Sequence, residues 1–417
     1  MAQLWKTYKS SVLLLGAMIL GGVIGAIWGE GATVLQPVAD LFLNLLYCCV
    51  VPFIFCSIVA AVTKMTDLAK LKKILIIFIV AVFITGIVAC LFMVIPSLIT
   101  DPAEGYVLES AEEVTDLSSS LNVLGMFTVS DFSALLSRKN LLALIVFAML
   151  FSFGTIRAGE KGKKITDAMD AATAVLVKVL GIVMKLAPIG LGCYFAILIG
   201  QYGAEVVGPM GKAILMYLII TLVYFVVSQT VYAYIGAGMP GVKKWWATCV
   251  APTLTALGTC SSAATLPTNM IQAREIGIPD EIADVTIPLG ANLHKDGSCS
   301  IQIIKIAFLC SVFGVTYATA GNILMSIFVS VISGVVMGGI PAGGYVAEIF
   351  IMSAFGFPNA AIPIMVLIGT ITDAISTAVN VTGDTGLAMV IARFVEGKDW
   401  FAKAQAAKQE IPAEVQE

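Results

Sequence analysis

The chain is organised around NLHKDG, residues 292–297, which interrupts an otherwise apolar segment from about 285 to 315. Three ionisable side chains stand in a row there, and one of them, His294, is the only histidine of the sequence. An ionisable side chain at bilayer depth costs about 2.5–3.5 kcal/mol on insertion scales, so such residues usually face a cavity, a partner or a substrate path. Gly297 would allow a helix to unwind locally. The stretch is therefore predicted to form the floor of a binding site.

The composition indicates a membrane protein. The 417 residues are 59% hydrophobic and only 12% charged, whereas a soluble domain carries about 25% charged residues. This favours a polytopic α-helical membrane protein. The net charge of −3 gives no reason to expect a nucleic-acid partner. The nine cysteines lie mostly in apolar segments without metal-ligand spacing, which is typical of reduced thiols.

Apolar runs long enough to span a membrane precede the central stretch, at about 11–28, 35–62, 74–99, 141–156, 168–199 and 214–235. No small-residue cleavage site follows the first run, so it is predicted to be a retained span. Basic residues follow the second, fourth and sixth runs, and an acidic loop follows the third. The positive-inside rule then places the N-terminus and the C-terminal tail in the cytoplasm of a protein of the plasma (inner) membrane.

Two later apolar segments are interrupted by small and polar residues, at 258–267 and 334–344. Each arm is short for a membrane span, so each segment is predicted to be a re-entrant helical hairpin with its tip near the middle of the membrane. Non-helical backbone at that depth must be buried in protein or line a wet cavity. Interrupted segments at corresponding places in two repeats indicate a transporter binding site. The alternative is a pair of kinked ordinary helices.

The last apolar span, about 362–392, carries one polar stripe, made of Asp373, Thr377, Asn380 and Asp384. At about 100° per residue these four positions fall within roughly 60° of one another. Ser376 flanks the stripe, and Gly383 would let backbone approach it. Two carboxylates on one face of a membrane helix indicate a function, such as binding an ammonium group, a metal cation or a proton. The alternative is charge pairing with Lys295 or Lys305 for packing alone.

The motifs TLP at 265–267, PLGA at 288–291, DG at 296–297 and NVTGD at 380–384 occur in an order and spacing that resembles the dicarboxylate/amino acid:cation symporter family. This family includes excitatory amino acid transporters, neutral amino acid exchangers and archaeal aspartate transporters. The resemblance covers nearly the whole chain. It implies an all-α polytopic protein of eight transmembrane helices and two re-entrant hairpins, built from inverted repeats, that works as an elevator-type homotrimer.

The resemblance also implies a division of the chain. Residues 1–70 would hold scaffold helices 1 and 2, and 71–100 would hold helix 3 of the transport domain. Residues 101–205 would hold the external loop and scaffold helices 4 and 5. Residues 206–396 would form the rest of the transport domain, namely helix 6, hairpin 1, helix 7, hairpin 2 and helix 8. Residues 397–417 would be a cytoplasmic tail.

Residue roles carry over from the family position by position. Asp373 matches the aspartate that takes the substrate amino group, Asn380 matches the asparagine that binds the α-carboxylate, and Asp384 matches a sodium ligand. The second hairpin matches the gate that closes over the substrate. The full predicted substrate-binding set is Ser261, Ser262, Ile340, Pro341, Gly344, Asp373, Ser376, Thr377 and Asn380.

Two departures from the family concern the substrate. Members that carry acidic substrates have an arginine where Ser376 stands, and archaeal members have another where Cys260 stands. Without arginine, a second substrate carboxylate would be costly to bury. We therefore expect a neutral L-amino acid that is small or polar. The alternatives are a sodium- or proton-coupled symporter of dicarboxylates or acidic amino acids and, in another class, an anion-conducting channel. An enzyme is not expected, because no nucleophile with a base or metal set is present, and no cofactor is predicted.

Further departures concern coupling. Sodium-using members carry NMDG where this chain has His294, Lys295, Asp296 and Gly297. The hydroxyl residues that ligate sodium on helix 3 of relatives align with Ala81 and Val82, and backbone-ligand positions of the second hairpin align with Gly334 and Met337. These sodium sites are therefore expected to be degenerate, and no metal site is predicted. Lys295 is expected to act as a tethered cation that pairs with Asp296 or Asp384. Transport would then be uncoupled, an exchange, or linked to a proton on His294, Asp384 or Lys295.

Lys305 and Glu348 are intramembrane ionisable residues that match no role in the family. They are expected either to pair with each other or to face water.

Overall fold

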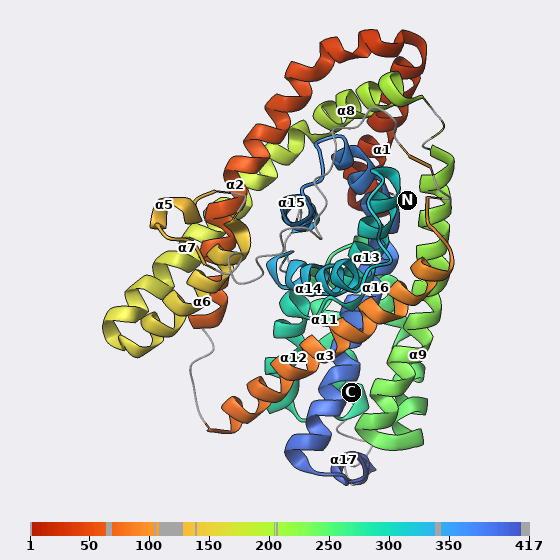
Figure 1. The fold of residues 1–417 in the computed structure, drawn as a ribbon. Coiled ribbons are helices and arrows are strands. Elements are labelled where there is room, and N and C mark those ends of the chain that lie inside the picture. Colours follow the sequence, from red (N-terminus) through yellow and green to blue (C-terminus); the bar gives the residue numbers. More distant parts are fainter. Residues whose placement is uncertain are drawn as a thin grey trace.

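A computed structural model describes residues 2–63, 69–103, 106–107, 128–137, 140–203, 205, 207–337 and 343–409. All regular elements in these ranges are helices, and no strand occurs among them (Figure 1). This confirms the predicted all-α architecture. By length and hydropathy, five helical stretches of the described chain are able to cross a membrane, and a sixth if one bent helix pair counts as a single span.

The first half of the chain forms the helices α1 (Ala2–Trp28), α2 (Gln36–Thr63), α3 (Ala69–Ile99), α5 (Phe132–Leu135), α6 (Leu141–Arg157), α7 (Glu160–Val183) and α8 (Ala187–Tyr202). Two 3₁₀ turns, η1 (Gly29–Leu35) and η4 (Met184–Leu186), join some of them. α1 packs against α8, and α2 packs against α6, α7 and α8. The run 168–199 was expected to be one span, but η4 divides it and α7 and α8 are bent by 54°. Pro188 lies in the first turn of α8, a position that suits proline because the N–H that it lacks would have no helical partner there.

The second half forms the helices α9 (Val207–Thr248), α10 (Val250–Thr259), α11 (Ser262–Ile276), α12 (Asp280–Leu293), α13 (Asp296–Val312), α14 (Ala320–Met337), α15 (Gly343–Phe355), α16 (Ala361–Glu396) and α17 (Trp400–Gln409). α16 runs through the centre of this group and packs on α9, α10, α11, α12 and α13 (Figure 1). Its residues from Ser376 to Ala392 are all buried. The polar stripe predicted from the sequence therefore lies in the middle of the second half.

Both interrupted segments are pairs of helices that pack on each other, α10 with α11 and α14 with α15, as a hairpin requires. Cys260 turns the first hairpin in the left-handed region, at φ 49°, and Ser261 caps α11 by accepting a hydrogen bond from Ala264 N. The tip of the second hairpin, 338–342, lies outside the described residues, so the predicted substrate contacts Ile340 and Pro341 lie there as well.

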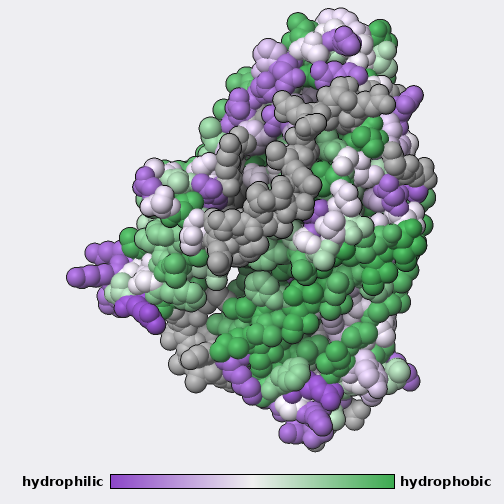
Figure 2. All heavy atoms as spheres, in the orientation of Figure 1, coloured by the Kyte–Doolittle hydropathy of each residue, from purple (hydrophilic) through white to green (hydrophobic). Residues whose placement is uncertain are grey.

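Exposed apolar side chains form a broad face over α3 and α9, and polar side chains bound it at the end near α17 (Figure 2). Examples are Ile84 and Val88 on α3 and Ile219 and Val226 on α9, all of which are well exposed. A contiguous apolar surface of this kind is what a helix bundle presents to lipid.

The predicted C-terminal tail contains a packed helix. Trp400, the first residue of α17, is buried, and its indole donates a hydrogen bond to Gly236 O at 2.9 Å. Arg393 at the end of α16 donates to Ile235 O, also at 2.9 Å. Both carbonyls precede the point where α9 breaks, at Ala237 and Gly238. The end of the chain thus binds backbone acceptors that the break in α9 releases.

Candidate functional site

The central stretch forms a break between two helices. α12 ends at Leu293, and His294 (φ −86°, ψ 107°) and Lys295 (φ −136°, ψ 45°) are not helical. α13 then begins at Asp296, so the predicted unwinding lies before Gly297 rather than at it. Gly297 is needed for another reason, because a Cβ there would collide with Ser376 O of α16.

Asn380 of α16 satisfies the freed start of α13. Its Oδ1 accepts hydrogen bonds from Gly297 N at 2.8 Å and Ser298 N at 3.2 Å. Its Nδ2 donates to Ser298 Oγ at 2.9 Å. An amide in this position stabilises backbone donors that the interrupted helix leaves unpaired. The family role of Asn380 toward a substrate α-carboxylate remains a prediction.

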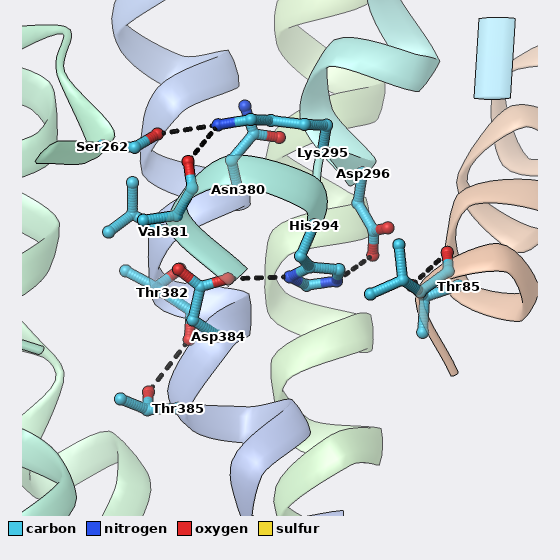
Figure 3. A network of polar contacts seen from close by, with 12 residues as sticks. Thr85, Ser262, His294, Lys295, Asp296, Asn380, Val381, Thr382, Asp384 and Thr385 are labelled. Atoms are coloured by element: carbon cyan, nitrogen blue, oxygen red, sulfur yellow. Dashed lines mark hydrogen bonds and ion pairs between the residues drawn. The ribbon is translucent and has the colours of Figure 1, made fainter. Parts of the chain in front are cut away.

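His294 lies between two buried carboxylates (Figure 3). Its Nδ1 is 3.1 Å from Asp384 Oδ1, and its Nε2 is 3.3 Å from Asp296 Oδ2. The exposed fraction of all three residues is 1% or less. The contact with Asp384 has hydrogen-bond geometry, whereas Nε2 has no hydrogen-bond partner that meets that geometry. One imidazole thus stands between two anions that would otherwise be costly to bury.

Asp296 has two further partners, both from α9. Tyr224 and Tyr232 donate their hydroxyl hydrogens to Asp296 Oδ2 at 2.8 and 2.7 Å. Neither tyrosine was predicted from the sequence as part of the site. They are eight residues apart, so they lie on nearly one face of a long apolar helix, and this periodicity was the signal that would have indicated them.

Lys295 points the other way, toward the first hairpin (Figure 3). Its Nζ donates to Ser262 Oγ at 3.0 Å and to Ala291 O at 2.7 Å, and its exposed fraction is 4%. The expected ion pair of Lys295 with Asp296 or Asp384 does not occur among the described contacts. The physical reason is the break, which turns adjacent side chains in different directions and leaves both carboxylates to His294.

Glycines make room for these charged side chains. A Cβ at Gly290 would collide with the Asp384 carboxylate, and one at Gly383 would lie 2.5 Å from His294 Cε1. A Cβ at Gly334 of α14 would lie 3.2 Å from Lys295 Cβ. Real Cβ atoms rarely approach so closely. Glycine at these three positions therefore leaves the space that the side chains of Asp384, His294 and Lys295 occupy.

The structure brings several predicted substrate residues together along α16. Asp373 stands at the exposed end of the stripe and accepts a hydrogen bond from Thr377 at 3.4 Å. Ser376 is buried, and its Oγ lies 3.5 Å from Ser298 Oγ. Gly344 is half-buried near the start of α15. The stripe therefore runs from an accessible carboxylate to a buried one, Asp384.

Two of the aligned sodium-ligand positions, Ala81 and Val82, have apolar surroundings. Ala81 and Val82 of α3 pack in an apolar cluster with residues such as Ile282 and Ile287 of α12. Met337 is the last residue of α14.

Lys305 and Glu348 form an ion pair, which confirms one of the two expectations for them. Lys305 Nζ lies 2.6 Å from Glu348 Oε1, and both side chains are buried.

The chain resembles known proteins over nearly its whole length. The model of the family described as "Sodium:dicarboxylate symporter family" matches residues 11–394. A proton/sodium-glutamate symport protein of Geobacillus stearothermophilus is 26% identical over 93% of this chain and 96% of the relative. A protein of the same description from Bacillus subtilis is 27% identical over 95% of each chain. A C4-dicarboxylate transport protein of Bacillus subtilis is 25% identical over 84% of this chain and 85% of the relative.

The family and these relatives are transporters, which confirms that the chain is a membrane transporter and not an enzyme. The matched region includes both hairpins, the broken α12–α13 pair and the polar stripe of α16. The chain belongs to the sodium:dicarboxylate symporter family.

Proposed function

We propose that this protein carries a small or polar neutral L-amino acid across the plasma membrane without using sodium. The observation that carries the proposal is the position of Lys295, whose ammonium group is held by a hydroxyl oxygen and a carbonyl oxygen in the interior of the site. Oxygens of these types are ligands that a hard metal cation prefers. A fixed ammonium group therefore stands where a mobile cation would find its ligands.

The charge of Lys295 opposes the binding of a second cation nearby. Two unit charges 4 Å apart repel by about 4 kcal/mol at an effective dielectric constant of 20. His294 also disfavours a bound cation, because its ring nitrogens already contact the carboxylates of Asp296 and Asp384. The carboxylates thus already have protein partners, which supports transport without sodium.

The substrate class follows from the α16 stripe. Asp373 is the exposed carboxylate and suits a substrate ammonium group. Ser376 is buried and uncharged, so the stripe offers no bidentate partner for a second carboxylate. A zwitterion with an uncharged side chain matches these groups best.

A second candidate is an acidic amino acid or a dicarboxylate, and two observations favour it. The relatives are described as glutamate and C4-dicarboxylate transport proteins. Lys295 also uses only two described hydrogen-bond partners, which leaves an ammonium hydrogen for a carboxylate.

Uptake into proteoliposomes distinguishes the two candidate functions. Sodium, potassium and pH gradients are imposed one at a time, and labelled alanine or serine is followed with unlabelled serine, threonine, aspartate and succinate as competitors. We expect uptake and exchange that do not depend on sodium and are inhibited by neutral amino acids. Sodium-driven accumulation would contradict the proposed sodium independence, and strong preference for aspartate or succinate would contradict the proposed neutral substrate. The pH gradient distinguishes proton-linked from uncoupled transport.

We infer the membrane arrangement from the family and the loop charges. Both termini would lie in the cytoplasm, and the protein would be a homotrimer with an elevator mechanism. Cross-linking of the purified protein in lipid and labelling of terminal tags from either side test the trimer and the orientation.

A further inference from the structure

The Lys305–Glu348 pair joins α13 to α15, the second arm of the second hairpin. The distance of 2.6 Å is that of a strong charge-assisted hydrogen bond. The exposed fractions of the two residues are 2% and 6%. A buried ion pair gains little net stability, because apolar residues of similar volume often stabilise a protein as well or better. Its presence in an otherwise apolar interface indicates a role in positioning.

α15 has few other directional contacts. It packs on α14 and, less extensively, on α16. Apart from Glu348, its buried side chains, such as Ile349, Phe350 and Ile351, are apolar. Apolar contacts allow a helix to slide or tilt. Among the described residues, no second side-chain hydrogen bond or ion pair connects α15 to another helix. The orientation of this arm thus depends on one polar link.

Gly369 of α16 completes the arrangement. A Cβ at this position would lie 2.8 Å from Lys305 Nζ and 3.0 Å from Glu348 Oε1. The ion pair therefore rests directly on the backbone of α16. Asp373 follows Gly369 by four residues, so it lies one helical turn away on the same face. The polar link of α15 is thus next to the carboxylate assigned to the substrate amino group.

We propose that Lys305 and Glu348 are a pair of positioning residues that latch α15 onto α13 and α16 beside Asp373, and that this latch sets the affinity for substrate. Neither residue is a substrate ligand in this proposal. The effect on affinity rests on the proposed function, whereas the latch itself does not.

Hydrogen–deuterium exchange of the protein in lipid nanodiscs, without substrate, tests the latch. The variants are Glu348→Gln, which leaves the buried ammonium group of Lys305 unpaired, and the double variant Lys305→Met/Glu348→Met, which removes both charges of the pair. We expect amides of 343–355 to exchange about tenfold faster in both variants, with the peptides of α6 unchanged. If the double variant exchanges like the wild type, only the unpaired charge matters and the latch is wrong.

A third variant disturbs the pair without removing a charge. Gly369→Ala places a methyl group against both charged atoms, and we expect it to speed the exchange of 343–355 as well. The matched control is Gly208→Ala in α9, where a Cβ would meet nothing within 4 Å. Equal acceleration in α6 and α15 would show a general loss of stability and would overturn the proposal.

Uptake kinetics test the effect on affinity. We expect the double variant to raise KM about tenfold with kcat changed less than about twofold, because the loosened arm weakens the bound state of substrate more than later steps. An unchanged KM with faster exchange of α15 would overturn the link to affinity. If the wild type transports no amino acid, the proposed function fails, and the exchange measurement still decides on the latch.

Discussion

His294 and Asp384 lie 90 residues apart in the sequence, yet Nδ1 of the one is 3.1 Å from Oδ1 of the other. Glycines on both sides allow this contact, since Gly383 faces the imidazole and Gly290 faces the carboxylate. The pair joins the break between α12 and α13 to the polar stripe of α16. It therefore connects the two features that the sequence shows separately.

Substituting Gly383 with alanine tests whether this close approach is required. The new Cβ would lie 2.5 Å from His294 Cε1, and overpacking of this kind costs about 1–3 kcal/mol. We expect lower thermal stability in detergent and a large loss of uptake, because the imidazole must leave one of its carboxylates. Gly211→Ala in α9, with no atom within 4 Å of its Cβ, is the control and keeps wild-type behaviour. Normal uptake in Gly383→Ala would show that transport does not require the imidazole of His294 to stay in contact with both carboxylates.

Removing the imidazole tests the charge balance of the site. His294→Ala leaves the buried carboxylates of Asp296 and Asp384 without their shared partner, and such a loss costs about 3–5 kcal/mol. We expect a clear fall in the melting temperature. His294→Ala combined with Asp384→Asn is expected to be more stable than the sum of the single effects predicts, since one unpaired charge is then absent. Additive effects would argue against a direct interaction.

The two tyrosines of α9 are expected to stabilise Asp296. Tyr224→Phe and Tyr232→Phe each remove one hydrogen bond to a charged oxygen, which is worth about 1.5–3 kcal/mol. Chemical or thermal denaturation of each variant in detergent measures this loss. Tyr234→Phe is the control, because its side chain is exposed at the apolar surface. A loss of the same size in Tyr234→Phe would contradict the assignment.

Introducing an arginine into the stripe tests the substrate class. Ser376→Arg places a guanidinium group at the position where the family resemblance predicts an arginine for acidic substrates. We expect aspartate to compete at lower concentration and alanine at higher concentration than in the wild type. Ser376→Ala separates the loss of the hydroxyl from the gain of charge. If aspartate already competes best in the wild type, or gains nothing in Ser376→Arg, the neutral substrate is the wrong assignment.

Restoring two family residues tests sodium independence. Lys295→Met with His294→Asn removes the fixed ammonium and the imidazole together. We still expect no full sodium coupling, because Ala81 and Val82 lack ligand oxygens in their apolar surroundings. Uptake by this variant under a sodium gradient and under a potassium gradient is the measurement. Full sodium-driven accumulation by this variant would show that Lys295 and His294 alone prevent sodium coupling in the wild type.

Much of the fold could be predicted from local properties of the sequence. Hydropathy indicates the membrane helices because each span must be apolar over the thickness of the bilayer. The interruptions at 258–267 and 334–344 indicate hairpins because small and polar residues do not continue a lipid-facing helix. The bend between α7 and α8 was missed, although Pro188 was visible, because a proline alone does not say how far two helices turn.

The sequence by itself determined that the chain is a helical membrane transporter and that Asp373, Thr377, Asn380 and Asp384 share one face, since the helical repeat is a local property. Only the tertiary structure decided which charges meet. His294 and Lys295 are neighbours in the chain, but the break directs one to Asp384 and the other to Ser262. The distances between charges on different helices depend on how the helices pack and where glycines allow close approach, and spacing along the chain does not contain that information.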